Sequence, residues 1–247
     1  MAIVYADNVL PETSGIAENL NLGAVGDTVT LPAGVTLKTN KIMDAGGNNI
    51  ITSDGSGNLT VDSQLSGSFA LIGTNTITNA ASSAFTTGFS DRKIYMFSFS
   101  GMKPATDGMM WTCQFSSDGG STYSTTITST SWRQYHNNDG SASGMGYVTD
   151  SQQSQGTAYQ ALTESNSPNV VGNVGGEALG GFMYLFNPSS TTYVKHFYST
   201  VSYTQANDRN QETWVGGYCN TTSAINAVNF KFSSGNITSG TIKLYGL

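Results

Sequence analysis

Residues 95–115 read YMFSFSGMKPATDGMMWTCQF. At both ends of this stretch, in YMFSF (95–99) and in WTCQF (111–115), a large apolar side chain stands at every second position. A period of two residues is typical of a β-strand that buries one face, whereas a helix repeats after three or four residues. Each run is bounded by Gly, Asp or Ser, which favour turns. The stretch therefore predicts two half-buried antiparallel strands.

The same alternation recurs to the end of the printed sequence and predicts at least seven strands. Helical periodicity is nearly absent, and only residues 14–22 fit one or two helical turns. Strands that follow one another without intervening helices favour an all-β fold, an antiparallel β-sandwich of the jelly-roll kind, over an α/β fold. Long loops are expected at residues 137–145, 150–156 and 163–176. The further alternating runs are Phe182–Phe186, Tyr193–Tyr203, Val228–Phe232 and Ile242–Leu244.

The composition is polar but nearly uncharged. Only 11% of the residues are charged, against roughly 25% in an ordinary soluble domain. The net charge of −6 excludes a strongly basic nucleic-acid-binding protein. Residues 1–9 hold Asp7 and no Lys or Arg, and no stretch approaches the ~20 apolar residues of a membrane span. Neither export nor membrane insertion is therefore expected, and the hydroxyl and amide surface is typical of proteins that join an assembly or contact carbohydrate.

Charge and aromatic content divide the chain into two regions. Residues 1–65 have a net charge of −5 and a single aromatic residue, Tyr5. Residues 66–247 have a net charge of −1 and contain every Trp and Phe. Short extended pieces within 28–37 and 49–61 predict small hairpins, which are only marginally stable alone. We therefore expect residues 1–65 to gain stability by packing on identical copies or on another protein, and residues 66–247 to form the jelly-roll-like sandwich domain.

No catalytic motif stands out around the histidines and cysteines. The two histidines, His136 and His196, belong to no nucleophile motif, and His196 is expected to be structural or to lie in an interface. The two cysteines, Cys113 and Cys219, lack the spacing of metal ligands. We expect both to be buried free thiols, with a disulfide between them as the alternative.

A metal or cofactor site is not expected either. The oxygen-rich run at residues 54–62 resembles a calcium loop only superficially, because Leu59 and Leu65 stand where an EF-hand needs Gly and Glu. The carboxylates of residues 66–247 stand mostly beside Gly, Asn or Ser, which is typical of turn residues. Their pairing for glycoside hydrolysis is not determined by the sequence.

The strongest candidate contact patch lies in residues 132–136, which read WRQYH. Trp132, Arg133, Tyr135 and His136 precede a polar loop. Exposed aromatic and Arg side chains contribute most to the energetics of interfaces, and aromatic rings also stack on sugars. The alternative is that this segment is an ordinary strand edge whose Trp132 belongs to the core.

Three stretches of the second region share a strand-and-turn pattern: PATDGMMWTCQFSSDGGSTYSTT (104–126), LFNPSSTTYVKHFYS (185–199) and GGYCNTTSAINAVNFKFSSGNITSGTIKLYGL (216–247). Together they resemble a β-sandwich module of virion-surface proteins of marine tailed bacteriophages. The resemblance covers roughly residues 68–247 and carries no catalytic signature. It implies a homotrimer that closes a fibre or decorates a head, is made in the host cytoplasm and is located on the virion. In the first region, TLPAGVTLKTN (30–40) and GGNNIITSDGSGNLT (46–60) are similar to small β-repeats that join such proteins to the particle.

Three functional hypotheses follow from these features. The preferred one is a homotrimeric head-decoration (cement) protein, whose residues 1–65 grip the major capsid protein on the capsid exterior. The alternative is a short tail fibre or receptor-binding protein attached to tail or portal proteins. Its loops around residues 132–139 and 163–176 would bind host surface polysaccharide or an outer-membrane protein. The third, a glycan-degrading enzyme, requires two carboxylates about 5–10 Å apart in an exposed cleft.

Overall fold

A computed structural model describes residues 41–43, 49–53, 55–56, 59–61, 70–89, 92–165 and 169–247. The chain divides into two compact units, residues 1–61 and 62–247. The helical turns expected at residues 14–22 and the hairpin expected at residues 28–37 lie outside the described residues.

The described part of the first unit is a three-stranded antiparallel sheet. Its strands are β1 (Lys41–Met43), β2 (Asn49–Ser53) and β3 (Leu59–Val61), in the order β1-β2-β3. The antiparallel pairing of β2 with β3 confirms the hairpin predicted within residues 49–61. No side chain of β1 or β2 is buried. This small sheet therefore has little apolar core in its described strands.

The second unit consists of strands and one short 3₁₀ helix, η1 (Thr149–Ser151), in its described residues. Its strands are β4 (Ala70–Ala80), β5 (Ser83–Phe85), β6 (Ile94–Pro104), β7 (Trp111–Ser116), β8 (Ile127–Asn137), β9 (Ser143–Tyr147), β10 (Gln160–Ala161), β11 (Leu179–Phe186), β12 (Lys195–Gln205), β13 (Arg209–Cys219), β14 (Ala227–Phe232) and β15 (Ile237–Gly246).

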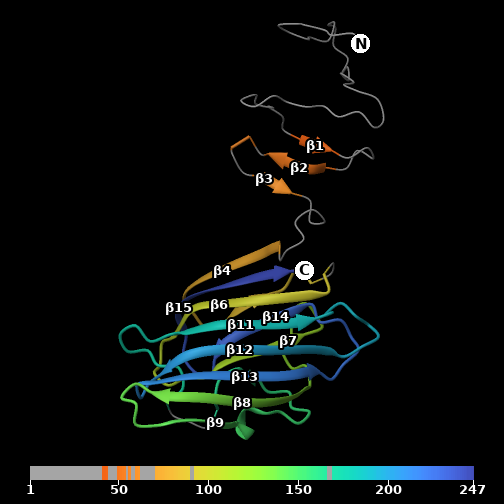
Figure 1. Ribbon diagram of the computed structural model, residues 1–247. Helices are drawn as coiled ribbons and strands as arrows, with labels where there is room; N and C mark the ends of the chain where they lie inside the picture. Colours follow the sequence, from red (N-terminus) through yellow and green to blue (C-terminus); the bar gives the residue numbers. More distant parts are fainter. Residues whose placement is uncertain are drawn as a thin grey trace, which may run out of the picture. The chain divides into compact units, whose positions relative to one another are not determined.

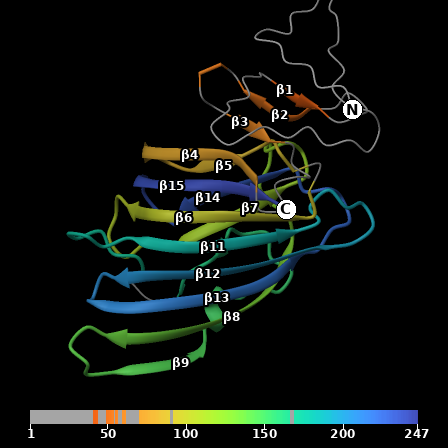
Figure 2. The same ribbon diagram turned by 45° about the horizontal axis from the view of Figure 1, so that its top comes forward.

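These strands form two antiparallel sheets that pack as a sandwich. Eight strands lie side by side in the order β4-β15-β6-β11-β12-β13-β8-β9, and four form the second sheet in the order β10-β7-β14-β5 (Figures 1 and 2). Figure 1 looks onto the larger sheet, with β7 and β14 behind it. The predicted all-β, antiparallel sandwich is confirmed.

Aromatic side chains fill the space between the two sheets. The ring of Phe97 lies 5.1 Å from that of Phe230, and Phe99 lies 5.7 Å from Trp111, both in edge-to-face geometry. Further along, Phe115 packs 5.2 Å from Phe197. Edge-to-face pairs add to the free energy gained by burying the rings. The alternation that predicted β6 and β7 thus places their large side chains in the core. The expectation of a half-buried strand is wrong for β7, whose six residues are all buried. Its polar face is covered as well, and Gln114 there donates to the backbone oxygens of residues 157 and 158.

Strand β11 presents its aromatic residues to the outside. The predicted alternation is present, but Met183 and Leu185 are the buried side chains. Phe182 is 44% exposed on the opposite face. Apolar residues occupy both faces of this strand, so its period does not determine which face turns inward. The larger sheet therefore carries aromatic rings on its outer surface.

The expectation of a continuous loop at residues 137–145 is wrong, because β9 begins at Ser143. All five residues of β9 are exposed, and the strand pairs with β8 at the edge of the large sheet. Strand β9 reads SGMGY, in which only Met145 and Tyr147 are large apolar residues. A run this short is too weak a period-two signal to predict a strand. The short helix η1 begins just before the loop expected at residues 150–156.

Candidate functional site

The outer faces of β8, β9 and β13 carry a candidate binding site of the sandwich unit. In β13, Thr213 and Val215 are buried toward the core. Because successive side chains of a strand point to opposite faces, Glu212 and Trp214 point outward. The register of β13 with β8 then sets three outward pairs side by side: Trp214 with Trp132, Glu212 with Gln134, and Asn210 with His136.

Trp132 and Trp214 form a parallel stack at the centre of this face. Their ring centroids are 4.0 Å apart, and the ring planes differ by 6°. Trp132 is only partly buried and does not belong to the buried core cluster. On its other side, the register places Tyr147 of edge strand β9 opposite Trp132. Tyr147 is 77% exposed, which leaves that side of the stack accessible.

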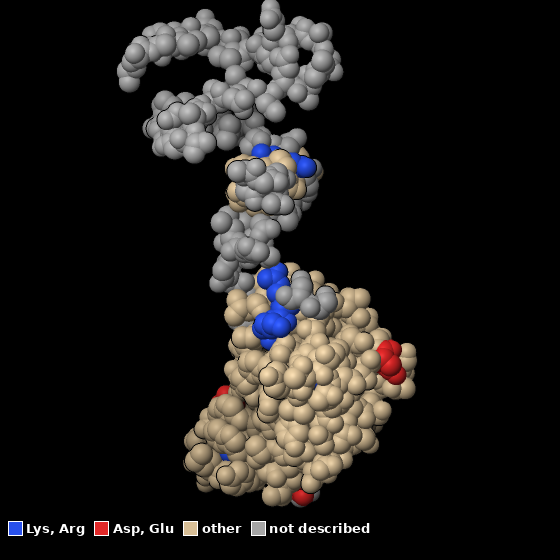
Figure 3. Space-filling view, turned by 90° about the vertical axis from the view of Figure 1, so that its right-hand side faces the viewer, with Lys and Arg blue, Asp and Glu red and all other residues tan. Residues whose placement is uncertain are grey.

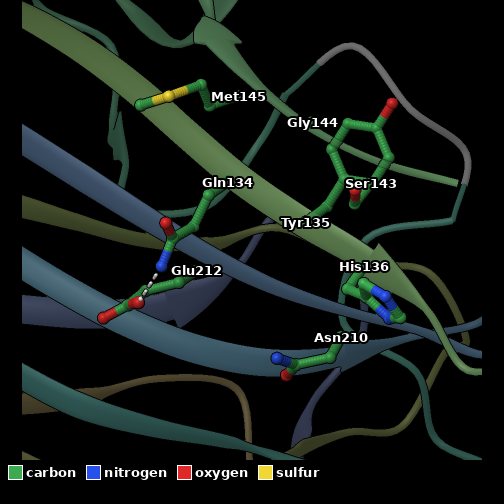
Figure 4. Close-up of a pocket in the computed structure, with 8 residues that line it drawn as sticks. All are labelled: Gln134, Tyr135, His136, Ser143, Gly144, Met145, Asn210 and Glu212. Atoms are coloured by element: carbon green, nitrogen blue, oxygen red, sulfur yellow. Dashed lines mark hydrogen bonds between the residues drawn. The ribbon is translucent and has the colours of Figure 1, made fainter.

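Two adjoining hollows lie over β8 and β9 and share the exposed side chain of Met145. The smaller, of about 310 Å³, is bounded by Trp132, Met145, Gly146 and Tyr147, and we call it the aromatic hollow. The larger, of about 420 Å³, is the polar hollow shown in Figure 4. It is lined by Gln134, Tyr135, His136, Ser143, Gly144, Met145, Asn210 and Glu212.

Glu212 is the one acidic residue that lines either hollow. Gln134 donates a hydrogen bond from Nε2 to Glu212 Oε2 at 2.9 Å, and the two side chains point toward each other in Figure 4. Thr200 Oγ1 donates to the other carboxylate oxygen at 3.2 Å. Two neighbouring strands thus hold the carboxylate in place. No Lys or Arg lines either hollow.

Arg133 lies on the opposite, inner side of β8, where it forms an ion pair with the buried Glu164. Glu164 Oε2 also accepts hydrogen bonds from Gln205 Nε2 at 3.2 Å and Gln211 Nε2 at 3.1 Å. Tyr203 accepts a 2.7 Å hydrogen bond from Gln211 Nε2. Burial raises the pKa of the Tyr203 phenol well above its ordinary value. The network fixes β8 from beneath the site.

Tyr135 also belongs to the inner side of β8 but reaches the polar hollow at the sheet edge. The guanidinium carbons of Arg209 and Arg133 lie 4.2 and 5.5 Å from its ring centroid. Its partner in β9 is Gly144, where an added Cβ would lie 3.1 Å from the Tyr135 hydroxyl oxygen. The absence of a side chain at Gly144 therefore leaves room for the ring.

The structure divides the four residues of the sequence-based contact patch between two faces. Trp132 and His136 point to the outer face, whereas Arg133 and Tyr135 alternate to the inner one. The described residues of the loop at 163–176, which are 163–165 and 169–176, do not line the two hollows. Several residues of the site were not identified from the sequence: Gln134, Met145, Tyr147, Asn210, Glu212 and Trp214.

A second group of rings covers the outer face of β11 and β12, and we call it the β11–β12 patch. Tyr184 stacks on Tyr198 with centroids 4.9 Å apart, and Phe186 lies 5.9 Å from Tyr198. Phe182 and Tyr198 are each 44% exposed. His196 points outward on the same strand as Tyr198, as its alternation with Phe197 predicted. In the view of Figure 3, most of the sandwich surface belongs to uncharged residues.

Cys113 and Cys219 are buried free thiols, as expected, and the disulfide alternative is not formed. Burial raises the pKa of both thiols.

Within the described ranges, no group of three or more His, Cys, Asp and Glu residues is arranged to hold a metal ion. The described part of the chain also holds no helix with the length and apolar character to cross a membrane.

No family model, curated protein or solved structure matches this chain.

Proposed function

We propose that this chain is a non-enzymatic virion-surface protein of the receptor-binding kind, whose sandwich unit binds glycan on the host surface. The observation that carries the proposal is the pair of adjoining hollows on the outer face of β8 and β9. One hollow offers aromatic rings and the other offers amide, imidazole, hydroxyl and carboxylate groups. The virion assignment is supported by the sequence resemblance of residues 68–247.

Aromatic and polar groups of this kind suit a sugar ring. The apolar faces of a pyranose stack on indole or phenol rings, while its hydroxyls need hydrogen-bond donors and acceptors. Trp132 and Tyr147 provide the rings, and Gln134, Asn210 and Glu212 provide the polar groups. Hollows of about 310 and 420 Å³ fall at the lower end of the roughly 300–1,000 Å³ of ligand sites.

Binding is supported better than hydrolysis. Glycosidases ordinarily use two carboxyl groups that flank the scissile bond. The two hollows are lined by a single carboxylate, Glu212, whose oxygens already accept hydrogen bonds from Gln134 and Thr200. An anchored acceptor of this kind suits recognition of a hydroxyl group.

The test is binding of the purified full chain to an array of host-surface polysaccharides, followed by calorimetry. Wild type is expected to bind, and Trp132→Ala is expected to lose most of the affinity while remaining folded. Tyr193→Ala is a matched control, because Tyr193 is 69% exposed and lines neither hollow. Equal losses in both variants, or a Trp132→Ala variant that binds like wild type, would contradict the proposal.

The β11–β12 patch favours a second candidate, the head-decoration protein. Large exposed apolar patches are rare on monomers and mark protein interfaces. The exposed rings of Phe182 and Tyr198 would then pack against a capsid protein or a neighbouring copy. Copy number on intact virions separates the candidates, because decoration requires hundreds of copies in a lattice and a tail-borne receptor-binding protein only a handful.

A further inference from the structure

Resting on the proposed glycan-binding function, we infer that the ligand is an uncharged oligosaccharide of at least two sugar rings that lies along β8. One ring stacks in the aromatic hollow, and the next is hydrogen-bonded in the polar hollow.

The direction of the ligand follows from the strand geometry. Trp132, Gln134 and His136 stand on one face of β8 at alternate positions. A strand rises about 3.4 Å per residue, so these side chains span roughly 14 Å along the strand. The two hollows follow each other in this direction and meet at Met145. A single sugar ring is too short to fill both.

The aromatic subsite is supported from behind. Trp214 covers one face of Trp132 at a centroid distance of 4.0 Å and keeps the indole upright on the sheet. The side toward β9 opens into the aromatic hollow beside Tyr147. A ring that is already held in its binding orientation loses little conformational entropy when a sugar stacks on it. Trp214 is therefore a positioning residue for Trp132.

The polar subsite is built around Glu212. A carboxylate has about four lone-pair sites, and Gln134 and Thr200 occupy two of them. The remaining sites can accept hydrogen bonds from sugar hydroxyls. Asn210 and His136 stand next to each other across β13 and β8 and line the same hollow.

The charge of the site selects against acidic sugars. Glu212 is the charged group that lines the polar hollow, and it would repel a uronate, sialate or sulfate. The nearby Arg133 is paired with Glu164 on the inner side of the sheet. Arg209 donates from Nε to Asn137 Oδ1 at 2.9 Å and lies over Tyr135. Neither guanidinium lines the hollows, so an anionic group would meet no countercharge there.

The experiment uses the purified full chain and three oligosaccharide series of one to four rings. The neutral series are cello-oligosaccharides and N-acetylglucosamine oligomers, and the acidic series is oligogalacturonate. We expect at least one neutral series to bind, with affinity rising about tenfold or more from one ring to two, as a second subsite becomes filled. Oligogalacturonate is expected to bind at least tenfold more weakly than the neutral oligomer of equal length.

Glu212→Gln tests the charge argument directly, because the amide keeps the size of the side chain and one carbonyl acceptor. We expect this variant to lose part of its affinity for neutral oligomers and to discriminate less against oligogalacturonate. Trp214→Ala is expected to weaken binding through Trp132, and Trp214→Phe to restore part of it. Tyr193→Ala is again the control and should leave every series unchanged.

The outcomes separate the two proposals. Stronger binding of oligogalacturonate than of either neutral series overturns the ligand class while glycan binding stands. Equal affinity for one ring and for longer oligomers overturns the two-subsite arrangement. No binding to any of the series or to the polysaccharide array overturns both this inference and the proposed function.

Discussion

Glu164 is a buried carboxylate that connects three strands beneath the proposed site. It holds the ion pair with Arg133 on β8 and accepts hydrogen bonds from Gln205 on β12 and Gln211 on β13. Loss of one partner from a buried pair leaves the other charge uncompensated. The stability of the site should therefore depend on a residue that does not line it.

We predict that Glu164→Gln lowers the free energy of unfolding by about 2–3 kcal/mol, less than the 3–5 kcal/mol of a fully buried pair. The reduction is expected because 26% of the Arg133 side chain is exposed and can be solvated by water. Urea unfolding of the full chain measures the change. The double variant Arg133→Met/Glu164→Gln should lose less stability than the sum of the losses in Arg133→Met and Glu164→Gln. Strict additivity would show that the two side chains act independently.

Lys195 is a buried cation on the core side of β12, with its ammonium donating to the backbone oxygen of Thr221 at 3.2 Å. Burial lowers the pKa of this amine. Because the pKa is lowered, the folded state binds the proton of Lys195 less strongly than the unfolded state does. The free energy of unfolding therefore rises with pH between the pKa of Lys195 in the folded chain and the ordinary Lys pKa near 10.4.

We predict that Lys195→Met is at least as stable as wild type at pH 7, because an apolar side chain of similar length avoids desolvation of the charge. The difference in stability between Lys195→Met and wild type should shrink as pH rises toward about 10.4 and above, because the wild-type amine then becomes neutral in the folded and in the unfolded chain. Thermal unfolding of both proteins from pH 7 to 10.5 measures the difference. A constant difference across this range would show that titration of Lys195 does not contribute.

At the scale of elements, the loop after β7 is organised by Asp118. Its carboxylate accepts hydrogen bonds from Ser116 Oγ at 2.5 Å, from the Thr122 backbone N–H at 2.9 Å and from Thr122 Oγ1 at 2.6 Å. The hydrogen bonds from Ser116 and Thr122 lower the pKa of this carboxyl to about 2. Asp118 thereby stabilises the connection between β7 and β8.

The stability of the folded chain should therefore fall as the Asp118 carboxylate becomes protonated at low pH. A depressed pKa contributes stability above the ordinary value near 3.9, and this contribution is lost as pH falls toward 2. Asp118→Asn should therefore melt below wild type at pH 7, and the two melting temperatures should converge between pH 4 and 2. If the difference between the two melting temperatures stays constant over that range, the destabilisation by Asp118→Asn comes from packing and not from loss of the charge.

The strands that could be predicted from the sequence are those with one apolar and one polar face. The core positions Phe97 of β6 and Phe230 of β14 follow strict alternation, so both the strand and its buried face were evident. Strand β11 is apolar on both faces, so only tertiary packing decides that Phe182 points outward. Strand β9 has no buried residue, and backbone pairing at the edge alone defines it.

Only the part of the candidate site on β8 could be predicted from the sequence, because strand pairing decides which other residues join it. Trp132 and His136 could be identified because aromatic and polar residues cluster locally around them. Trp214 and Glu212 stand some 80 residues later, and only the register of β13 with β8 brings them beside that cluster. The signal that could have found them was the alternation within RNQETWVGGYC (209–219), whose partner strand the sequence does not specify.

At the scale of the whole molecule, the two units differ in how much core they possess. The sandwich unit buries a continuous cluster of aromatic and aliphatic side chains between its sheets. In the first unit, the described strands are three to five residues long and bury no described side chain. Short sheets of this kind are marginal in water without a partner surface. Residues 1–65 also have a net charge of −5, which a neighbouring protein surface would have to tolerate.

We predict that the full chain sediments as a trimer and that a variant chain starting at residue 66 sediments as a folded monomer. The reason is that copies of the first region supply one another with the buried surface that a single copy lacks. Analytical ultracentrifugation of both proteins, with circular dichroism to confirm that the shorter one is folded, measures the outcome. A trimer that persists without residues 1–65 would place assembly on the sandwich instead. Phe182→Ser and Tyr198→Ser in the β11–β12 patch would then be expected to dissociate it, because both rings are exposed there in the single chain.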